Sequence, residues 1–123
     1  MRTGSLTLGT RGSALALAQA RSVAAMLREA WPGLDVRLEV IRTGGDRLTD
    51  RPLAAFGQKG VFVRELEEAL LDGRIRAAVH SLKDLPSTLG APFVLAAVPP
   101  REDPRDCLVS RRGESLKELP AGA

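Results

Sequence analysis

The sequence predicts an α/β fold with a mainly parallel sheet and flanking helices. Short apolar segments typical of strands alternate with amphipathic helical segments, in the order strand, helix, strand, helix, strand. This alternation is the pattern of crossover connections between parallel strands. The chain has 123 residues, of which 44% are hydrophobic. It is therefore large enough for one domain with a real core, or for one domain and the start of another.

The first strand–helix–strand unit occupies the amino-terminal third of the chain. SLTLG (5–9) alternates apolar and polar residues and predicts a strand, and DVRLEVIR (35–42) predicts a second one. Between them, residues 13–31 predict an amphipathic helix that Pro32-Gly33 ends. The predicted apolar face of this helix consists of Ala16, Ala20, Val23, Leu27 and Trp31.

The following elements are a second helix and three more strands. Residues 61–73 predict a helix, because acidic side chains occupy its first turn and Gly73 suits its carboxyl-terminal cap. Its inward-facing residues are expected to be Phe62, Leu66 and Leu70. The segments 76–81, 93–98 and 106–110 are apolar and short, and each predicts a strand.

Composition narrows the possible partners. Charged residues make up 27% of the chain and leave a net charge of +3. A basic balance makes nucleic acid a candidate partner. Aromatic residues make up only 3% of the chain, however, and basic residues are interspersed with acidic residues in segments such as RELEEALLDGRIR. We therefore expect no nucleic-acid partner. No apolar run approaches the roughly 20 residues that span a bilayer, and the first residues do not resemble a signal peptide. A single cysteine fits a reducing compartment. We therefore expect a cytoplasmic protein with no membrane partner.

Two segments lead away from the carboxyl ends of the first two strands, where open α/β sheets collect ligands. GTRGSALALAQ (9–19) combines a tight turn with a helix start, to which Arg11 adds a forked cation and Ser13 a hydroxyl. Ser13 is also a good helix cap, and the two roles are compatible. The segment 43–60 contains four glycines and ends near Lys59 at the entrance to the next helix. Its length fits a functional lid and an ordinary surface loop equally well.

A third segment, RAAVHSLKDLP (76–86), brings polar side chains of several kinds to the end of a strand. Asp84 would pair with Lys83 or cap a turn in a purely structural interpretation. We favour a functional one, because adjacent opposite charges suit a ligand with carboxylates at its rim and N–H groups at its centre. His80 is interpreted as a hydrogen-bonded histidine at the strand end. No second histidine or cysteine lies at ligand spacing, so no metal site is expected.

These segments, in this order, resemble the porphobilinogen deaminases, also called hydroxymethylbilane synthases. The matching motifs are LGTRGSALALAQA, GQKGVFVRELE, AVHSLKDLP and PREDPRDCLVS. The resemblance implies a first domain like that of periplasmic binding proteins, within a monomeric three-domain transferase of heme and tetrapyrrole biosynthesis. Such an enzyme condenses four porphobilinogen molecules head to tail and releases ammonia at each addition. The growing pyrrole product is built on a dipyrromethane cofactor, which a thioether links to a cysteine of the third domain.

The resemblance also implies roles for particular residues. Asp84 would be the carboxylate beside the pyrrole nitrogens, where it stabilises the positive charge that develops when ammonia leaves. The other implied site residues are Arg11, Ser13, Gln19, Lys59, Ser81 and Lys83. Of these, Lys59 belongs to a mobile loop over the cleft and Gln19 lies near the substrate, while the other four bind carboxylates of the cofactor or substrate.

The resemblance covers only the first part of the family's pattern. We expect residues 1–99 to form the first, cleft-forming domain and residues 100–123 a proline-containing connector with the start of a second. The rest of the second domain and the cofactor-bearing third are expected to lie outside these 123 residues. Cys107 is in the wrong segment for cofactor attachment and is interpreted as a small apolar residue. We therefore expect the chain alone to be inactive. An alternative function is a small-anion binding module with the same kind of fold, which would gain nothing from a carboxylate at position 84.

Overall fold

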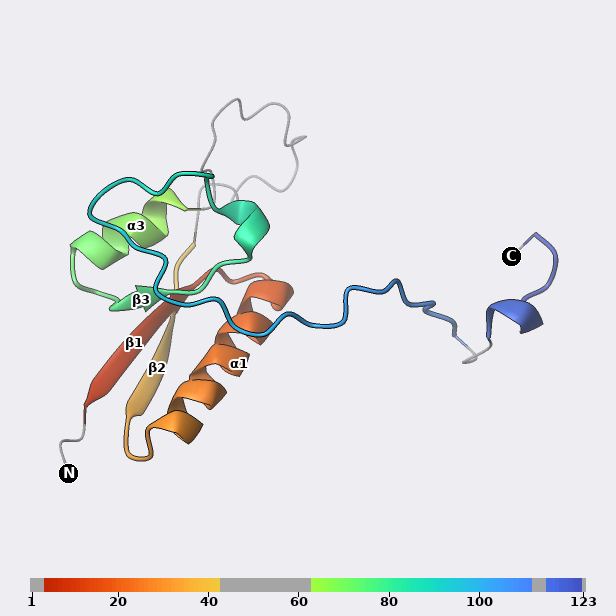
Figure 1. Cartoon of the computed structure of the whole chain (residues 1–123), viewed down its shortest axis with the longest axis horizontal. Coiled ribbons are helices and arrows are strands. Elements are labelled where there is room, and N and C mark those ends of the chain that lie inside the picture. The colour runs from red at the N-terminus through yellow and green to blue at the C-terminus, as the bar shows by residue number, and fades with distance from the viewer. Residues whose placement is uncertain (1–3, 43–62, 112–114, 123) are drawn as a thin grey trace.

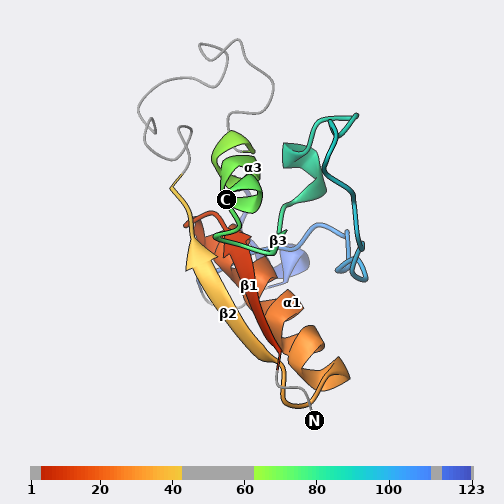
Figure 2. The ribbon, with the colours of Figure 1, turned by 90° about the vertical axis from the view of Figure 1, so that its left-hand side faces the viewer.

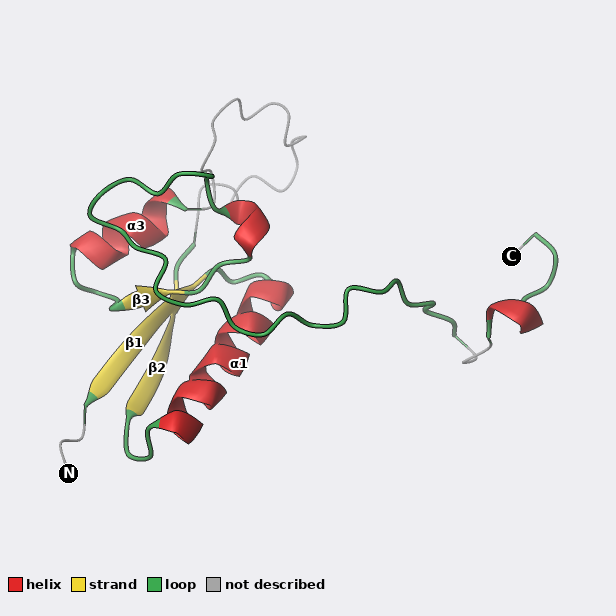
Figure 3. Cartoon of the chain, viewed as in Figure 1, coloured by secondary structure: helices red, strands yellow, loops and turns green. Residues whose placement is uncertain are grey.

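The computed structural model describes residues 4–42, 63–111 and 115–122. In the described part the elements are β1 (Ser5–Thr10), α1 (Ala14–Ala30), β2 (Asp35–Val40), α3 (Arg64–Leu71) and β3 (Ala77–Ala78). Two short 3₁₀ turns follow, η2 (Leu82–Asp84) and η3 (Leu116–Glu118). Figure 3 shows the strands side by side with both helices packed on them. The predicted α/β class is confirmed.

The sheet has three parallel strands in the order β2-β1-β3. β1 pairs with β2 along its whole length, from Ser5 opposite Asp35 to Thr10 opposite Val40. β3 pairs with β1 only through Ala77 and Ala78, which lie opposite Leu8 and Gly9. Because β1 is central and all strands are parallel, the segments that follow β1 and β3 leave the sheet at the same edge.

Successive residues of β1 point to opposite faces of the sheet, and each face has its own helix. Leu8 packs with Ala24 of α1 and Val36 of β2 in one buried cluster. Leu66 of α3 belongs to a second cluster, which also contains Ile41, Ala69 and Ile75. Figure 2 shows α1 running along β1 and β2, while α3 lies apart from it beside β3. The described core is therefore split into two layers by a thin sheet.

Gly9 allows the α3 layer to approach β1 closely. A methyl group built on Gly9 would overlap Ile75 Cδ1 and would lie 3.0 Å from Leu66 Cδ2. Both neighbours are fully buried, so neither can move aside into solvent. A larger residue at this position would push the strand and the second layer apart.

Helix α1 begins and ends almost where the sequence predicts. Ser13 caps it, because its Oγ accepts a hydrogen bond from the backbone N–H of Ala16 at 3.3 Å. The buried residues of α1 are Ala20 and Ala24. Trp31 was expected on the apolar face, but its side chain is 61% exposed. The reason is that Trp31 is the carboxyl-terminal cap, with φ −129° and ψ 81°, so it no longer follows the helical periodicity.

The helix predicted over 61–73 is α3, which is shorter than expected. Leu66 is buried and Leu70 is half-buried, as predicted, while Phe62 lies outside the described residues. Gly73 follows the cap residue Asp72 and adopts φ +70°, a conformation that favours glycine. Sequence reasoning therefore found the right terminating residue for this helix.

The prediction of strands at 93–98 and 106–110 is wrong. Neither segment is a strand, and the predicted strand at 76–81 contains only Ala77–Ala78. Val94 and Val109 are 80% and 89% exposed, so these apolar residues have no sheet neighbour in the described part of the chain. A strand needs a hydrogen-bonded partner, which local composition cannot guarantee.

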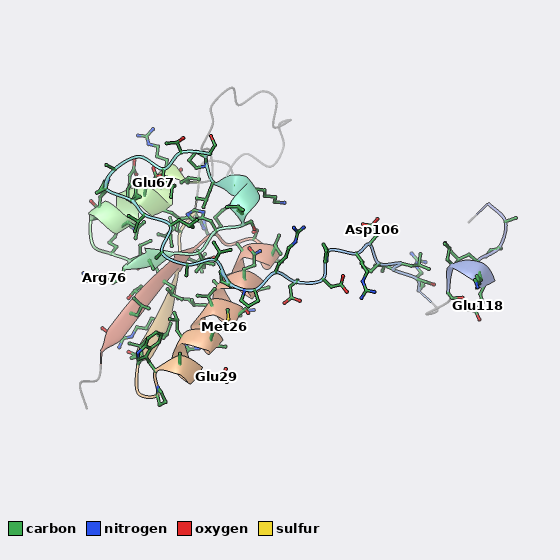
Figure 4. The ribbon with its side chains drawn as sticks, viewed as in Figure 1. Met26, Glu29, Glu67, Arg76, Asp106 and Glu118 are labelled. Atoms are coloured by element: carbon green, nitrogen blue, oxygen red, sulfur yellow. The ribbon has the colours of Figure 1, made fainter. Side chains whose placement is uncertain are left out.

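The carboxyl-terminal segment extends away from the sheet and helices (Figure 1). Figure 4 shows Asp106 and Glu118 on this extension, far from Glu67 of α3 and Met26 of α1. Within the residues described, no helix combines the length and apolar character needed to cross a membrane.

Candidate active site

The segments that follow β1 and β3 enclose a pocket of about 410 Å³ at the carboxyl edge of the sheet. Its lining residues are Arg11, Ser13, Leu15, Ala16, Val79, His80, Ser81, Lys83 and Asp84. Pockets for small molecules usually measure about 300–1,000 Å³. The two polar segments therefore line one concave surface.

The first wall of the pocket is fixed by the junction of β1 and α1. Thr10, the last residue of β1, is fully buried, and its Oγ1 lies 3.2 Å from the carbonyl oxygens of both Arg11 and Ala16. Its backbone carbonyl accepts a hydrogen bond from Ile41 N–H at 2.8 Å. Thr10 thus ties the turn to the helix and to the chain after β2. This holds Arg11 and Ser13 in place at the pocket.

The second wall follows β3. Backbone hydrogen bonds of 2.9 Å from Arg76 N–H to Thr7 O and from Val79 N–H to Gly9 O flank the two-residue strand. The chain then turns at Ser81 into η2, which contains Lys83 and Asp84. The short strand is enough to align this turn against the start of α1.

Arg11 and Asp84 form an ion pair across the pocket. Arg11 Nη1 donates to Asp84 Oδ2 at 3.3 Å, and the two side chains are only 16% and 18% exposed. The ion-pair partner of Asp84 is therefore Arg11. A purely structural interpretation of the sequence suggested instead that Asp84 pairs with Lys83 or caps a turn. With Lys83 also lining the wall, two cations and one carboxylate face the same pocket. Because the Arg11–Asp84 pair is largely shielded from solvent, the attraction between these two charges is stronger than it would be in bulk water.

Gln19 and Ser81 form the second contact between the two walls. Ser81 Oγ donates to Gln19 Oε1 at 2.7 Å, joining residues 62 positions apart. Gln19 lies on α1 and is not among the residues that line the described pocket. Its described contact with the pocket wall is therefore the hydrogen bond with Ser81.

His80 is a half-buried member of the pocket wall. Burial of the imidazole lowers the pKa of His80; Asp84 opposes this effect, and Arg11 adds to it. Its buried Nδ1 has no hydrogen-bond partner in the part of the chain that the structure describes. The interpretation of His80 as a hydrogen-bonded histidine is therefore wrong for this nitrogen.

Five of the seven predicted site residues come together at the pocket, and a sixth, Gln19, is hydrogen-bonded to one of them, Ser81. Lys59 and the predicted lid at 43–60 fall outside the described residues. Cys107, interpreted as an apolar residue, has an exposed side chain on the extended segment. Within the described ranges no cluster of three or more metal-donor side chains occurs. Sequence reasoning underrated His80, because only the fold shows that it faces the same space as Asp84.

The fold and this pocket define an α/β domain that presents cations, hydroxyl groups and one carboxylate at a parallel sheet edge. Residues 6–123 match the family model described as porphobilinogen deaminase, dipyrromethane cofactor binding domain. The chain therefore belongs to the porphobilinogen deaminase family.

Relatives in three bacteria illustrate this similarity. The porphobilinogen deaminase of Sorangium cellulosum is 57% identical over 119 residues, which is 96% of this chain and 39% of the relative. That of Syntrophotalea carbinolica is 53% identical over 123 residues, 100% of this chain and 39% of the relative. That of Maridesulfovibrio salexigens is 52% identical over 118 residues, 96% of this chain and 38% of the relative. The chain thus spans about two fifths of the length of the curated relatives it matches.

Proposed function

We propose that this chain forms one wall of the catalytic cleft of a hydroxymethylbilane synthase. The whole enzyme would join four porphobilinogen molecules head to tail, release one ammonia per addition and yield linear hydroxymethylbilane for heme and tetrapyrrole biosynthesis. The family match and the arrangement of Arg11, Lys83 and Asp84 around one pocket support this proposal.

The single observation that carries the proposal is the Arg11–Asp84 pair inside the pocket. Porphobilinogen has an acetate and a propionate on a pyrrole ring, so it presents carboxylates around one N–H donor. Arg11 and Lys83 suit the carboxylates, because charge-assisted hydrogen bonds to such groups are strong. Asp84 suits the N–H donor and would stabilise positive charge that develops on the ring. A pocket with only cations would not match this pattern.

The pocket also fits part of a dipyrromethane, whose rings carry the same substituents. When bound, that cofactor supplies the pyrrole carbon to which the first substrate is joined. In this chain Ser81 and Lys83 would hold its carboxylates, and Arg11 and Ser13 would bind carboxylates of cofactor or substrate. Lys59, in the segment before α3, would close over the cleft. We place the covalent attachment on a cysteine outside this chain, because Cys107 is exposed on the extension and not at the pocket.

The finer organisation is part of the same proposal. Residues 1–99 would be a cleft-forming domain like those of periplasmic binding proteins, and 100–123 a connector with the start of a second domain. The exposed apolar side chains of Val94, Val98 and Val109 support this division, because they offer surface for a second domain to cover. The full enzyme would act as a monomer in the cytoplasm, where an unpaired cysteine such as Cys107 stays reduced.

The alternative is a small-anion binding module without chemistry, which the two cations alone would favour. Asp84→Asn distinguishes the two functions by titration calorimetry of the 123-residue chain with porphobilinogen and with succinate. If the pyrrole N–H contacts Asp84, the substitution weakens porphobilinogen binding about tenfold and strengthens succinate binding, because a competing carboxylate is gone. Stronger binding of both ligands would support the anion module.

A second measurement tests the proposed place of the chain in the enzyme. We expect that incubation of these 123 residues with porphobilinogen leaves the intact mass unchanged and releases no ammonia catalytically, because Cys107, the single cysteine among them, does not lie at the pocket. A stable adduct on Cys107, or catalytic ammonia release, would contradict the assignment of the attachment site.

A further inference from the structure

Gln19 and Ser81 make a hydrogen bond whose direction matters for binding. Ser81 occupies the position of an amino-terminal cap before η2, where a serine usually accepts a backbone N–H. Its side chain makes no such cap bond. Instead, the hydroxyl hydrogen goes to Gln19 Oε1 at 2.7 Å. The one hydrogen of Ser81 is therefore directed toward α1, although Ser81 itself lines the pocket.

A serine hydroxyl has one hydrogen to donate and two lone pairs that accept. As the structure stands, Ser81 can offer the pocket only lone pairs, which suit an N–H group and repel a carboxylate. To donate to a ligand carboxylate, Ser81 must turn its hydrogen away from Gln19. A glutamine can accommodate this change, because reversal of its amide presents an N–H donor to the same hydroxyl oxygen.

We propose that Gln19 is a positioning residue that acts through Ser81, and that reversal of its amide lets Ser81 donate to a ligand carboxylate. The proposal rests on the proposed function, because it assumes a ligand with carboxylates. It gives Gln19 a role other than direct contact with substrate. It also explains why an amide suits this position better than a carboxylate, which can only accept hydrogen bonds.

The test is a double-mutant cycle on the 123-residue chain, with porphobilinogen as the ligand and calorimetry as the readout. The proteins are the wild type, Gln19→Glu, Ser81→Ala and the double variant. The introduced carboxylate keeps the Ser81 hydrogen, so Gln19→Glu should weaken binding about tenfold when Ser81 is present. In the Ser81→Ala background the same substitution should weaken binding less than about threefold, because only its through-space charge remains.

Gln19→Met provides a second arm, since it removes both amide groups without adding charge. Its loss of affinity should also largely disappear in the Ser81→Ala background. As a readout that a merely structural role would not move, the side-chain amide ¹⁵N–¹H signals of Gln19 should shift when porphobilinogen is added to the wild type, but not to Ser81→Ala.

The outcomes separate this inference from the proposed function. If the wild type binds porphobilinogen but both Gln19 substitutions lose equal affinity with and without Ser81, Gln19 contacts the ligand directly and the inference is wrong. If the folded wild-type chain binds no porphobilinogen at all, the proposed function of this pocket fails, and the inference fails with it.

Discussion

Replacement of Gly9 by alanine should destabilise the protein through one identifiable contact. The added methyl group would overlap Ile75 Cδ1 and approach Ile75 Cγ2 to 3.2 Å and Leu66 Cδ2 to 3.0 Å, whereas unstrained carbon atoms lie about 3.5–4.0 Å apart. Ile75 and Leu66 are 1% and 0% exposed, so relief requires movement of the backbone or of the core. Overpacking of this kind costs about 1–3 kcal/mol of unfolding free energy.

The assay is urea unfolding of Gly9→Ala, Ile75→Val and the double variant. Ile75→Val removes the Cδ1 atom that the new methyl group would overlap, and alone it should cost about 0.5–1.5 kcal/mol. The double variant should be more stable than the sum of the single effects predicts, by about 1 kcal/mol. Gly90→Ala is the matched control, because a methyl group there meets nothing within 4 Å. It should change stability by less than about 0.5 kcal/mol.

Additive losses in the Gly9→Ala and Ile75→Val cycle would refute this reasoning, since they would mean that Ile75 Cδ1 is not the obstacle. A Gly9→Ala variant as stable as the wild type would refute it more broadly. In that case the sheet and the α3 layer would be loose enough to admit a methyl group, contrary to the close packing described here.

Two further predictions concern the pocket. Asp84→Asn should lower the unfolding free energy by about 1–2 kcal/mol, because it weakens the largely buried contact with Arg11. Asp35→Asn, in an exposed ion pair, is the control and should change the unfolding free energy by less than about 0.5 kcal/mol. Equal effects of the two substitutions in urea unfolding would contradict this prediction. Burial lowers the pKa of His80, the single histidine of the chain, so its contribution to stability should be complete above about pH 6.5 and decline as the pH falls toward 5, where the unfolded chain binds the proton more readily. His80→Gln should remove that part of the decline, and identical pH profiles for the two proteins would show that His80 does not cause it.

Local patterns in the sequence were sufficient to identify the four longer elements. Alternation of apolar residues marks β1 and β2, and Ser13 and Gly73 mark helix ends, because these features depend on neighbours in the chain. Residues 93–98 show the limit of this reasoning. Their composition is that of a strand, yet strand formation depends on a partner that lies elsewhere.

The candidate site divides in the same way. Sequence motifs predicted functional roles for Arg11 and Asp84, but not the ion pair between them, which joins positions 73 residues apart. The Ser81–Gln19 hydrogen bond joins positions 62 residues apart, and it depends on how α1 lies beside the turn after β3. Such pairings depend on tertiary arrangement, which one-dimensional periodicity does not encode.

The uneven pairing of β1 has a consequence for how the pocket assembles during folding. β1, α1 and β2 are consecutive, and six residue pairs join the two strands. β3 joins β1 through two pairs, after a chain closure of roughly 70 residues that carries a larger entropic penalty. The wall with Arg11 should therefore form early and the wall with Asp84 late, and the same order should hold in reverse when the protein opens locally. Amide hydrogen exchange faster at residues 79–84 than at Leu6–Leu8 would reveal this order. A partly opened molecule would then keep its βαβ unit while its binding site is already dismantled.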